Sequence, residues 1–196
     1  MAGDADLTEA LEATAVVASV FESLCVDFFV GGSLASSLHG IPRSTQDVDL
    51  VADIEARHVA PLVATLSDGW MADDAMILDA IRRRAAFNLV RLATMFKVDV
   101  FVARQDAFAR QEMARRVTFE LPNGLRLPVA TAEDVVLQKL SWFRLGDAVS
   151  ERQWRDVVGV LRVGGSSLDR AYLDDWAARM DLGELLARAR READAP

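Results

Sequence analysis

Segment 47–52, D-V-D-L-V-A, begins by alternating acidic and apolar residues. Successive side chains along a β-strand point to opposite faces, so Asp47 and Asp49 share one face while Val48 and Leu50 share the other. Two neighbouring carboxylates repel each other and raise the pKa of at least one of them unless a cation compensates the charge. The pattern predicts a strand with one buried face. Its polar face is either a site for Mg²⁺ or Mn²⁺, which prefer oxygen ligands, or a solvated strand edge.

A third acid lies in an apolar stretch, F-K-V-D-V-F-V, at residues 96–102. Burying the carboxylate of Asp99 without a partner would be costly. One partner is Lys97, two residues away on the same face of the expected strand. The other possibility is that Asp99 joins Asp47 and Asp49, because three carboxylates on strands can hold two metal ions in a phosphoryl-transfer site.

Length and composition allow one domain, or one domain with a small helical appendage, because 52% of the 196 residues are apolar. The net charge of −8 argues against broad nonspecific binding to nucleic acid. No apolar run reaches the ~20 residues of a membrane span, and no signal peptide opens the chain, so we expect a cytoplasmic protein without a membrane partner. The single cysteine, Cys25, excludes an internal disulfide and is expected to be a small core residue.

Hydrophobic periodicity predicts strands and helices in alternation up to about residue 130, and helices alone after it. The expected fold class is α/β (α+β), with a mixed β-sheet flanked by helices over 1–130 and a helical region packed on that core over 131–196. The expected strands are 28–30, 47–52, 87–93, 95–102, 117–121 and 125–129, the last two joined through P-N-G at 122–124. The expected helices are 7–24, 33–39, 54–67, 73–84, 131–144, 150–164, 168–180 and 182–192.

Two glycines follow the first expected strand, in V-G-G-S at 30–33. In one interpretation, Gly31 and Gly32 form a turn between the strand and a helix that begins at Ser33. The backbone N–H groups of this turn and the Ser33 hydroxyl would then point towards a bound phosphate. The simpler interpretation is a tight turn in which Ser33 caps the helix. A phosphate site followed by paired carboxylates is the combination that a nucleotide with its metal ion requires.

The motif V-G-G-S-L-A-S-S-L-H-G-I-P-R-S-T-Q-D-V-D-L resembles the signature of the DNA polymerase β-type nucleotidyltransferase superfamily. In its fuller form it is similar to the AbiEii-type toxin nucleotidyltransferases and their small relatives. V-D-V-F at 98–101 resembles the third carboxylate strand of the superfamily. A-T-A-E-D-V-V-L-Q-K-L-S-W-F-R followed by R-Q-W-R-D-V-V-G-V-L resembles its helical motif, so the similarity spans roughly residues 28–162.

This resemblance implies a nucleotidyltransferase fold whose catalytic core lies in 1–130. It implies that Asp47, Asp49 and Asp99 are the catalytic, metal-binding carboxylates, with Asp99 helping to deprotonate the acceptor hydroxyl. It also implies a set of nucleotide-binding residues: Gly32 and Ser33 at the triphosphate, Arg43 at the loop or a phosphate, Lys139 at the triphosphate oxygens, and Asp156 orienting Lys139 or the acceptor. One departure is Gly159, which stands where many relatives carry a second aspartate.

The implied activity is metal-dependent transfer of a nucleoside monophosphate from a nucleoside triphosphate to a hydroxyl. The acceptor is left open among RNA, protein and a small molecule. A toxin role would add an antitoxin protein as partner. The alternatives are a small-molecule nucleotidyltransferase of the aminoglycoside-modifying type, and a non-catalytic nucleotide-binding regulatory module.

Overall fold

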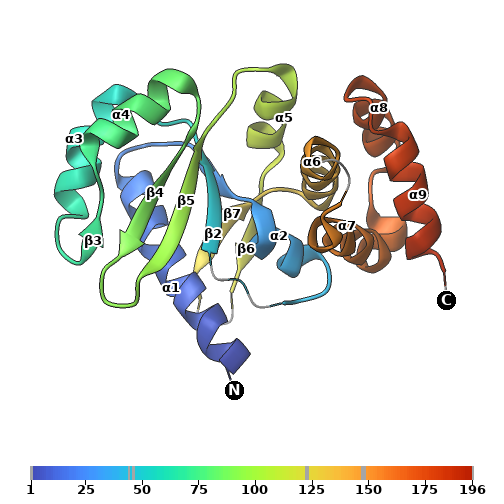
Figure 1. Ribbon diagram of the computed structural model, residues 1–196, viewed down its shortest axis with the longest axis horizontal. Helices are drawn as coiled ribbons and strands as arrows, with labels where there is room; N and C mark the ends of the chain where they lie inside the picture. Colours follow the sequence, from blue (N-terminus) through green and yellow to red (C-terminus); the bar gives the residue numbers. More distant parts are fainter. Residues whose placement is uncertain (1, 44, 46, 122–123, 147–148, 196) are drawn as a thin grey trace. The chain divides into compact units, whose positions relative to one another are not determined.

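The computed structural model describes residues 2–195 apart from 44, 46, 122–123 and 147–148, with side chains from residue 8 onward (Figure 1). Contacts within the chain divide it into two compact units. The first combines Met1–Gly31 with Ser44–Val129, and the second combines Gly32–Arg43 with Ala130–Pro196. Segment 32–43, between the glycine turn and the first acidic strand, is therefore grouped with the C-terminal helices.

The first unit is built on a mixed sheet of seven strands in the order β3-β4-β5-β2-β1-β7-β6. The strands are β1 (Phe28–Val30), β2 (Asp47–Ala52), β3 (Trp70–Met71), β4 (Ala86–Arg91), β5 (Phe96–Val102), β6 (Val117–Glu120) and β7 (Arg126–Val129). β2 runs parallel to β5 and β1 runs parallel to β7, while the other neighbouring pairs are antiparallel.

The centre of this sheet follows from the alternation in the sequence. Val48 and Leu50 of β2, and Val98 and Val100 of β5, are completely buried. The residues between them are only partly buried and occupy the other face. Burying these aliphatic side chains contributes roughly 1.5–3 kcal/mol each. Burial of these aliphatic side chains therefore determines which residues of β2 and β5 lie on the opposite, polar face.

Four helices belong to the first unit: α1 (Ala2–Ser23), α3 (Ala56–Thr65), α4 (Asp74–Arg83) and α5 (Ala107–Arg115). α1 contacts β2, β5 and α3, and Phe21 near its end packs on Phe28 with 5.5 Å between the ring centroids. α4 and α5 start at aspartate caps, because the carboxylates of Asp73 and Asp106 accept hydrogen bonds from the free N–H groups of the first turn.

The second unit is helical and consists of α2 (Gly32–His39), α6 (Ala132–Leu145), α7 (Glu151–Gly164), the 3₁₀ turn η1 (Gly165–Ser167), α8 (Arg170–Arg179) and α9 (Gly183–Ala193). α2 packs against α6 and α7, and α7 also contacts α9. The hydroxyl of Thr131 caps α6 by accepting a hydrogen bond from the N–H of Asp134. His39 at the end of α2 lies 2.7 Å from the carbonyl of Ala130, and burial lowers its pKa although that contact opposes the shift.

The loop after α2 approaches the backbone of α7 closely. A Cβ on Gly40 would lie 2.9 Å from the backbone nitrogen of Val160 and 3.0 Å from the carbonyl carbon of Gly159. A Cβ on Gly159 would already be in van der Waals contact with Ile41, at 3.5 Å. The absent aspartate at 159 therefore has a local explanation: a longer side chain would extend into the loop that crosses α7 here.

We predict that Gly40→Ala destabilises the protein by about 1–3 kcal/mol, because backbone atoms cannot move aside as a flexible side chain can. The matched control is Gly183→Ala, where a Cβ meets nothing within 4 Å and alanine suits the first turn of α9. Urea unfolding at neutral pH measures both. A loss below 0.5 kcal/mol (roughly the scatter of neutral surface substitutions) for Gly40→Ala would contradict the close approach.

The expected fold class is confirmed, as are all of the expected strands and helices, with ends shifted by a few residues. The two-residue strand β3, helix α5 and the turn η1 were not predicted. The hairpin of β6 with β7 is present, but the Pro-Asn part of its turn lies outside the described residues. Cys25 is exposed rather than buried, which corrects the sequence-based expectation. None of the helices within the described part of the chain is long and apolar enough to cross a membrane.

Candidate functional site

The parallel pairing of β2 with β5 aligns the candidate carboxylates in the first unit. Asp49 is the register partner of Asp99, and Asp47 is the register partner of Lys97. Register partners on adjacent strands point to the same face, about 4.8 Å apart. Three of the residues singled out in the sequence therefore lie on one partly buried sheet face, together with a lysine.

Lys97 supplies the positive charge of this face. Its Nζ lies 2.7 Å from Asp99 Oδ2, which confirms the pairing that their spacing suggested. This hydrogen bond is the main cause that raises the pKa of Lys97, and the charges of Asp99, Asp47 and Asp49 raise it further, against a smaller effect of partial burial. The ammonium therefore stays charged throughout the physiological pH range.

The second oxygen of Asp99 has no such contact. Oδ1 is buried and makes no hydrogen bond within the described residues. A buried carboxylate oxygen without a partner costs about 1–3 kcal/mol, and such groups are uncommon in native proteins. The Oδ1 atom therefore has a hydrogen-bonding capacity that no group of the described residues satisfies.

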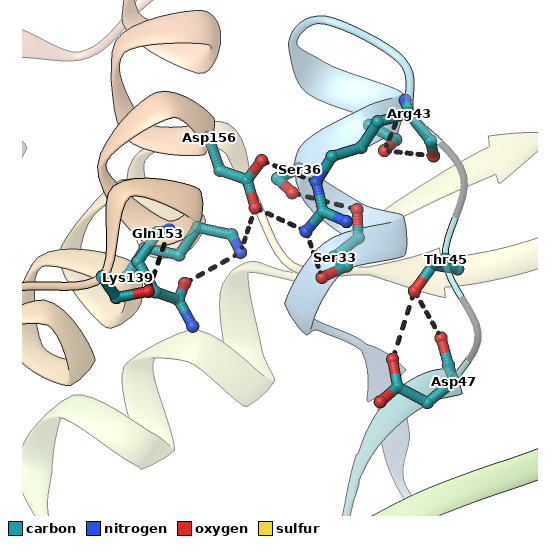
Figure 2. A network of polar contacts seen from close by, with 10 residues as sticks. Ser33, Ser36, Arg43, Thr45, Asp47, Lys139, Gln153 and Asp156 are labelled. Carbon is teal, nitrogen blue, oxygen red and sulfur yellow. Dashed lines mark hydrogen bonds and ion pairs between the residues drawn. The ribbon is translucent and has the colours of Figure 1, made fainter. Parts of the chain in front are cut away.

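Asp47 is held differently, by the loop that enters β2. The Thr45 hydroxyl lies 2.8 Å from the carbonyl oxygen of Asp47 and 3.2 Å from its Oδ1, as Figure 2 shows. Thr45 itself is almost completely buried, which fixes the start of the strand. Sequence reasoning did not single out this threonine.

A divalent cation is the group that these residues would hold. Among the described histidines, cysteines and acids, no three lie close enough together to form a ready-made metal site. Asp49 and Asp99 nevertheless supply carboxylate oxygens from adjacent strands, and the buried Oδ1 of Asp99 has no partner. The donor chemistry therefore fits Mg²⁺ or Mn²⁺ bound by Asp49 and Asp99, with Asp47 on the same face.

A second polar cluster lies within the helical unit and centres on Asp156 of α7 (Figure 2). Arg43 binds this carboxylate through two hydrogen bonds of 2.9 Å each. Nε donates to Oδ1 and Nη2 donates to Oδ2. Lys139 Nζ of α6 lies 2.7 Å from Oδ2 and 3.1 Å from the side-chain oxygen of Gln153. One carboxylate thus holds two cations from different segments.

Burial makes this cluster energetically important. The side chains of Lys139 and Asp156 are only 5% and 6% exposed, whereas that of Arg43 is 25% exposed. Burial alone would raise the pKa of Asp156, but the hydrogen bonds and charges of Arg43 and Lys139 lower it below the ordinary value of 3.8. Asp156 is therefore ionised at neutral pH and keeps both cations in place.

Gly32 and Ser33 open α2 in the same unit. Gly32 is the first residue of the helix and has φ = 54°, a conformation that glycine adopts more easily than other residues. Ser33 does not cap the helix as the simpler interpretation held, because it lies inside the first turn. Its Oγ accepts a hydrogen bond of 2.5 Å from Arg43 Nη2.

The fold of this unit thus brings together four residues that are widely separated in the sequence: Ser33, Arg43, Lys139 and Asp156. Gln153 is the partner that sequence reasoning missed in this cluster. The sequence did contain a feature that distinguishes Lys97, namely the rarity of lysine. Of the 22 lysines and arginines in the chain, only Lys97 and Lys139 are lysines. Both contact an aspartate of the candidate set.

No protein-family model matches this sequence, and no curated protein matches it. Solved structures do. An antigenic nucleotidyltransferase-like protein from Paracoccidioides brasiliensis is 18% identical with a TM-score of 0.57, over 92% of this chain and 91% of that one. The chain has the nucleotidyltransferase fold. The structure of ANT(2'')-Ia in complex with adenylyl-2''-tobramycin is also similar, at 17% identity and a TM-score of 0.55, over 89% of this chain and 97% of that one.

We predict that Asp156→Asn destabilises this nucleotidyltransferase-fold protein by about 3 kcal/mol at pH 7, because it leaves a buried lysine without its carboxylate. Since the folded-state pKa of Asp156 lies below 3.8, its contribution is complete above that pH and disappears as the pH falls through the folded-state value. The difference between variant and wild type should therefore shrink in strong acid.

Urea unfolding at pH 7, 4 and 2.5 (the last roughly below the unfolded-state value) tests this sign. The matched control is Asp175→Asn, which removes an exposed ion pair with Arg179 of α8 and should change stability by less than about 0.5 kcal/mol. A difference that grows with acidity would refute the assigned direction.

Proposed function

We propose that the protein transfers a nucleoside monophosphate from a nucleoside triphosphate to a hydroxyl group of an acceptor. The observation that carries this proposal is the pairing of Asp49 with Asp99 on adjacent parallel strands, where Asp99 keeps a buried oxygen without a partner. The nucleotidyltransferase fold agrees with it.

Asp47, Asp49 and Asp99 would hold Mg²⁺ or Mn²⁺ through their oxygens. Such an ion neutralises negative charge on the phosphates and holds them in line for displacement. The chain's own contribution is to fix these oxygens on a rigid sheet. Thr45 restrains Asp47, and the core packing of β2 and β5 restrains the other two.

Arg43, Lys139, Gly32 and Ser33 would bind the triphosphate. Arginine and lysine donate charge-assisted hydrogen bonds to phosphate oxygens, and a glycine turn at a helix start exposes backbone N–H groups. Asp156 would act as a positioning residue. It orients Arg43 and Lys139 before the ligand arrives, which reduces the ordering needed on binding.

The reaction forms a bond between the acceptor oxygen and the α-phosphorus and breaks the bond from that phosphorus to the bridging oxygen. Pyrophosphate leaves with the electron pair of the broken bond. The proton of the acceptor hydroxyl would pass to the carboxylate of Asp99. No oxidant or further co-reactant is required.

We predict that Asp49→Asn and Asp99→Asn each abolish Mg²⁺-dependent binding of nucleoside triphosphate. They should also slow pyrophosphate release by roughly 100-fold or more, since a metal-binding carboxylate contributes several kcal/mol to the transition state. Isothermal titration with each of the four ribonucleoside triphosphates and a pyrophosphate-release assay give the two readouts. The control is Asp53→Asn, which removes an exposed carboxylate just beyond β2.

Two outcomes would overturn the proposal. Wild-type protein that binds no triphosphate in the presence of Mg²⁺ is not a nucleotidyltransferase. Protein that binds a triphosphate but releases no pyrophosphate with any acceptor class would be the non-catalytic regulatory module instead.

For the acceptor, we propose a small polycationic molecule of the aminoglycoside class. The net charge of −8 favours a cationic partner over RNA. ANT(2'')-Ia, which shares the fold, is an antibiotic-resistance factor. The competing proposal is an AbiEii-type toxin that modifies RNA or protein and is restrained by an antitoxin protein.

We predict pyrophosphate release that depends on tobramycin or a related aminoglycoside and not on total RNA. The expected increase over buffer is at least ten-fold (on the order of 1.4 kcal/mol in transition-state free energy). Release with RNA or a protein extract and none with aminoglycosides would favour the toxin. Growth inhibition on expression, abolished by Asp47→Ala/Asp49→Ala, would support that second proposal.

A further inference from the structure

The distribution of lysine in this chain is uneven. Arginine provides 20 of the 22 lysine and arginine residues, and the two lysines are Lys97 and Lys139. Lysine differs from arginine in carrying a compact, strongly hydrated point charge on a flexible stem. It can therefore leave a carboxylate more easily than an arginine that grips the same carboxylate with two parallel hydrogen bonds. Arg43 and Asp156 form a pair of that second kind.

The surroundings of Lys97 allow such movement. Its side chain is 41% exposed, whereas that of its partner Asp99 is 15% exposed. Lys97 contacts Oδ2 of Asp99 while the buried Oδ1 has no hydrogen bond. One oxygen of the carboxylate is thus paired with a cation that can move towards water, and the other oxygen has no hydrogen-bond partner.

Charge balance explains why a cation is needed on this face. Asp47, Asp49 and Asp99 place three carboxyl groups on one side of two neighbouring strands. Lys97 compensates one of them and also interacts with the other two aspartates. A divalent ion entering the same face meets this positive charge, and like charges a few ångströms apart repel each other.

We propose that Lys97 is an internal counter-ion that takes the place of the metal at the carboxylates and is displaced from Asp99 when a divalent cation binds. This inference rests on the proposed metal-dependent function. It assigns Lys97 a positioning role, that of keeping the free carboxylate face stable and lowering its affinity for free metal. A lysine that only held the Asp99 side chain in position would have the opposite effect on metal affinity.

The first test measures Mn²⁺ binding to the protein alone by electron paramagnetic resonance of the free ion. Lys97→Met should bind Mn²⁺ at least about ten-fold more tightly than wild type, because the competing charge is gone. Lys97→Arg keeps the charge and can hold the carboxylate with two parallel hydrogen bonds, so it should bind Mn²⁺ no more tightly than wild type. Arg82→Met, which removes an exposed positive charge of α4, controls for net charge and should leave the affinity unchanged.

Thermal unfolding gives a second readout from the same variants. Lys97→Met should melt at a lower temperature than wild type without metal, since three carboxylates then face one another. Mn²⁺ should raise its melting temperature by more than it raises that of wild type, as tighter binding to the folded state requires.

The wild-type protein supplies a test that does not depend on a variant lacking the charge of Lys97. Reductive methylation with ¹³C-formaldehyde labels lysines while keeping their charge, and Lys97→Arg identifies the Lys97 signal by its loss. Addition of Mg²⁺ alone should shift the Lys97 resonance, because its ammonium leaves Asp99. Lys139 contacts Asp156 and Gln153 instead, so its resonance should change little.

The outcomes separate this inference from the function on which it rests. Wild type that binds Mn²⁺ while Lys97→Met binds it equally or more weakly refutes the counter-ion role and leaves the metal site standing. A Lys97 resonance that stays fixed while Mg²⁺ binds has the same meaning. If neither wild type nor Lys97→Met binds Mn²⁺, the metal site and the counter-ion both fail.

Discussion

The first unit depends on the register between β2 and β5. Six consecutive residue pairs, from Asp47 with Lys97 to Ala52 with Val102, are held together by three valines and one leucine that are completely buried on one face. A slip of one residue would turn the carboxylates into the core and the aliphatic side chains out of it, at a cost no local adjustment could offset. The alignment of Asp49 with Asp99 is thus enforced by core packing on the opposite face of the two strands.

Much of the first unit could be predicted because alternation and turn chemistry are local properties. The D-V-D-L and F-K-V-D-V-F-V stretches determine their own faces, and Thr131 and Ser150 mark helix starts by capping. Short elements such as β3 carry too few residues for a period to show. Cys25 was misjudged because its apolar neighbours suggested a core position, whereas the residue has φ = 54° in a turn and is exposed. Periodicity does not reveal a backbone conformation of that kind.

The residues of the candidate site likewise differ in how far the sequence could predict them. The three aspartates could be selected from the sequence because strand geometry places them, and Lys97 could be named as a partner from its spacing alone. The contacts of Asp156 could not be derived that way. Arg43 is 113 positions away from it, and no pattern in either segment indicates that one carboxylate serves both Arg43 and Lys139. The resemblance to a known superfamily suggested a link between Asp156 and Lys139, but the direct grip of Arg43 on that carboxylate is visible only in three dimensions.

The grouping of α2 with the C-terminal helices has a consequence for biosynthesis. The helices against which α2 packs, α6 and α7, leave the ribosome about ninety residues or more after it, as the 91-residue separation of His39 from Ala130 shows. Segment 32–43 must therefore wait, unpacked, until most of the chain has been made. Contacts of such long sequence separation slow folding and leave apolar residues such as Leu34 exposed in the meantime. A chain that ends before α7 lacks Asp156 and therefore cannot form the Arg43 and Asp156 cluster at all.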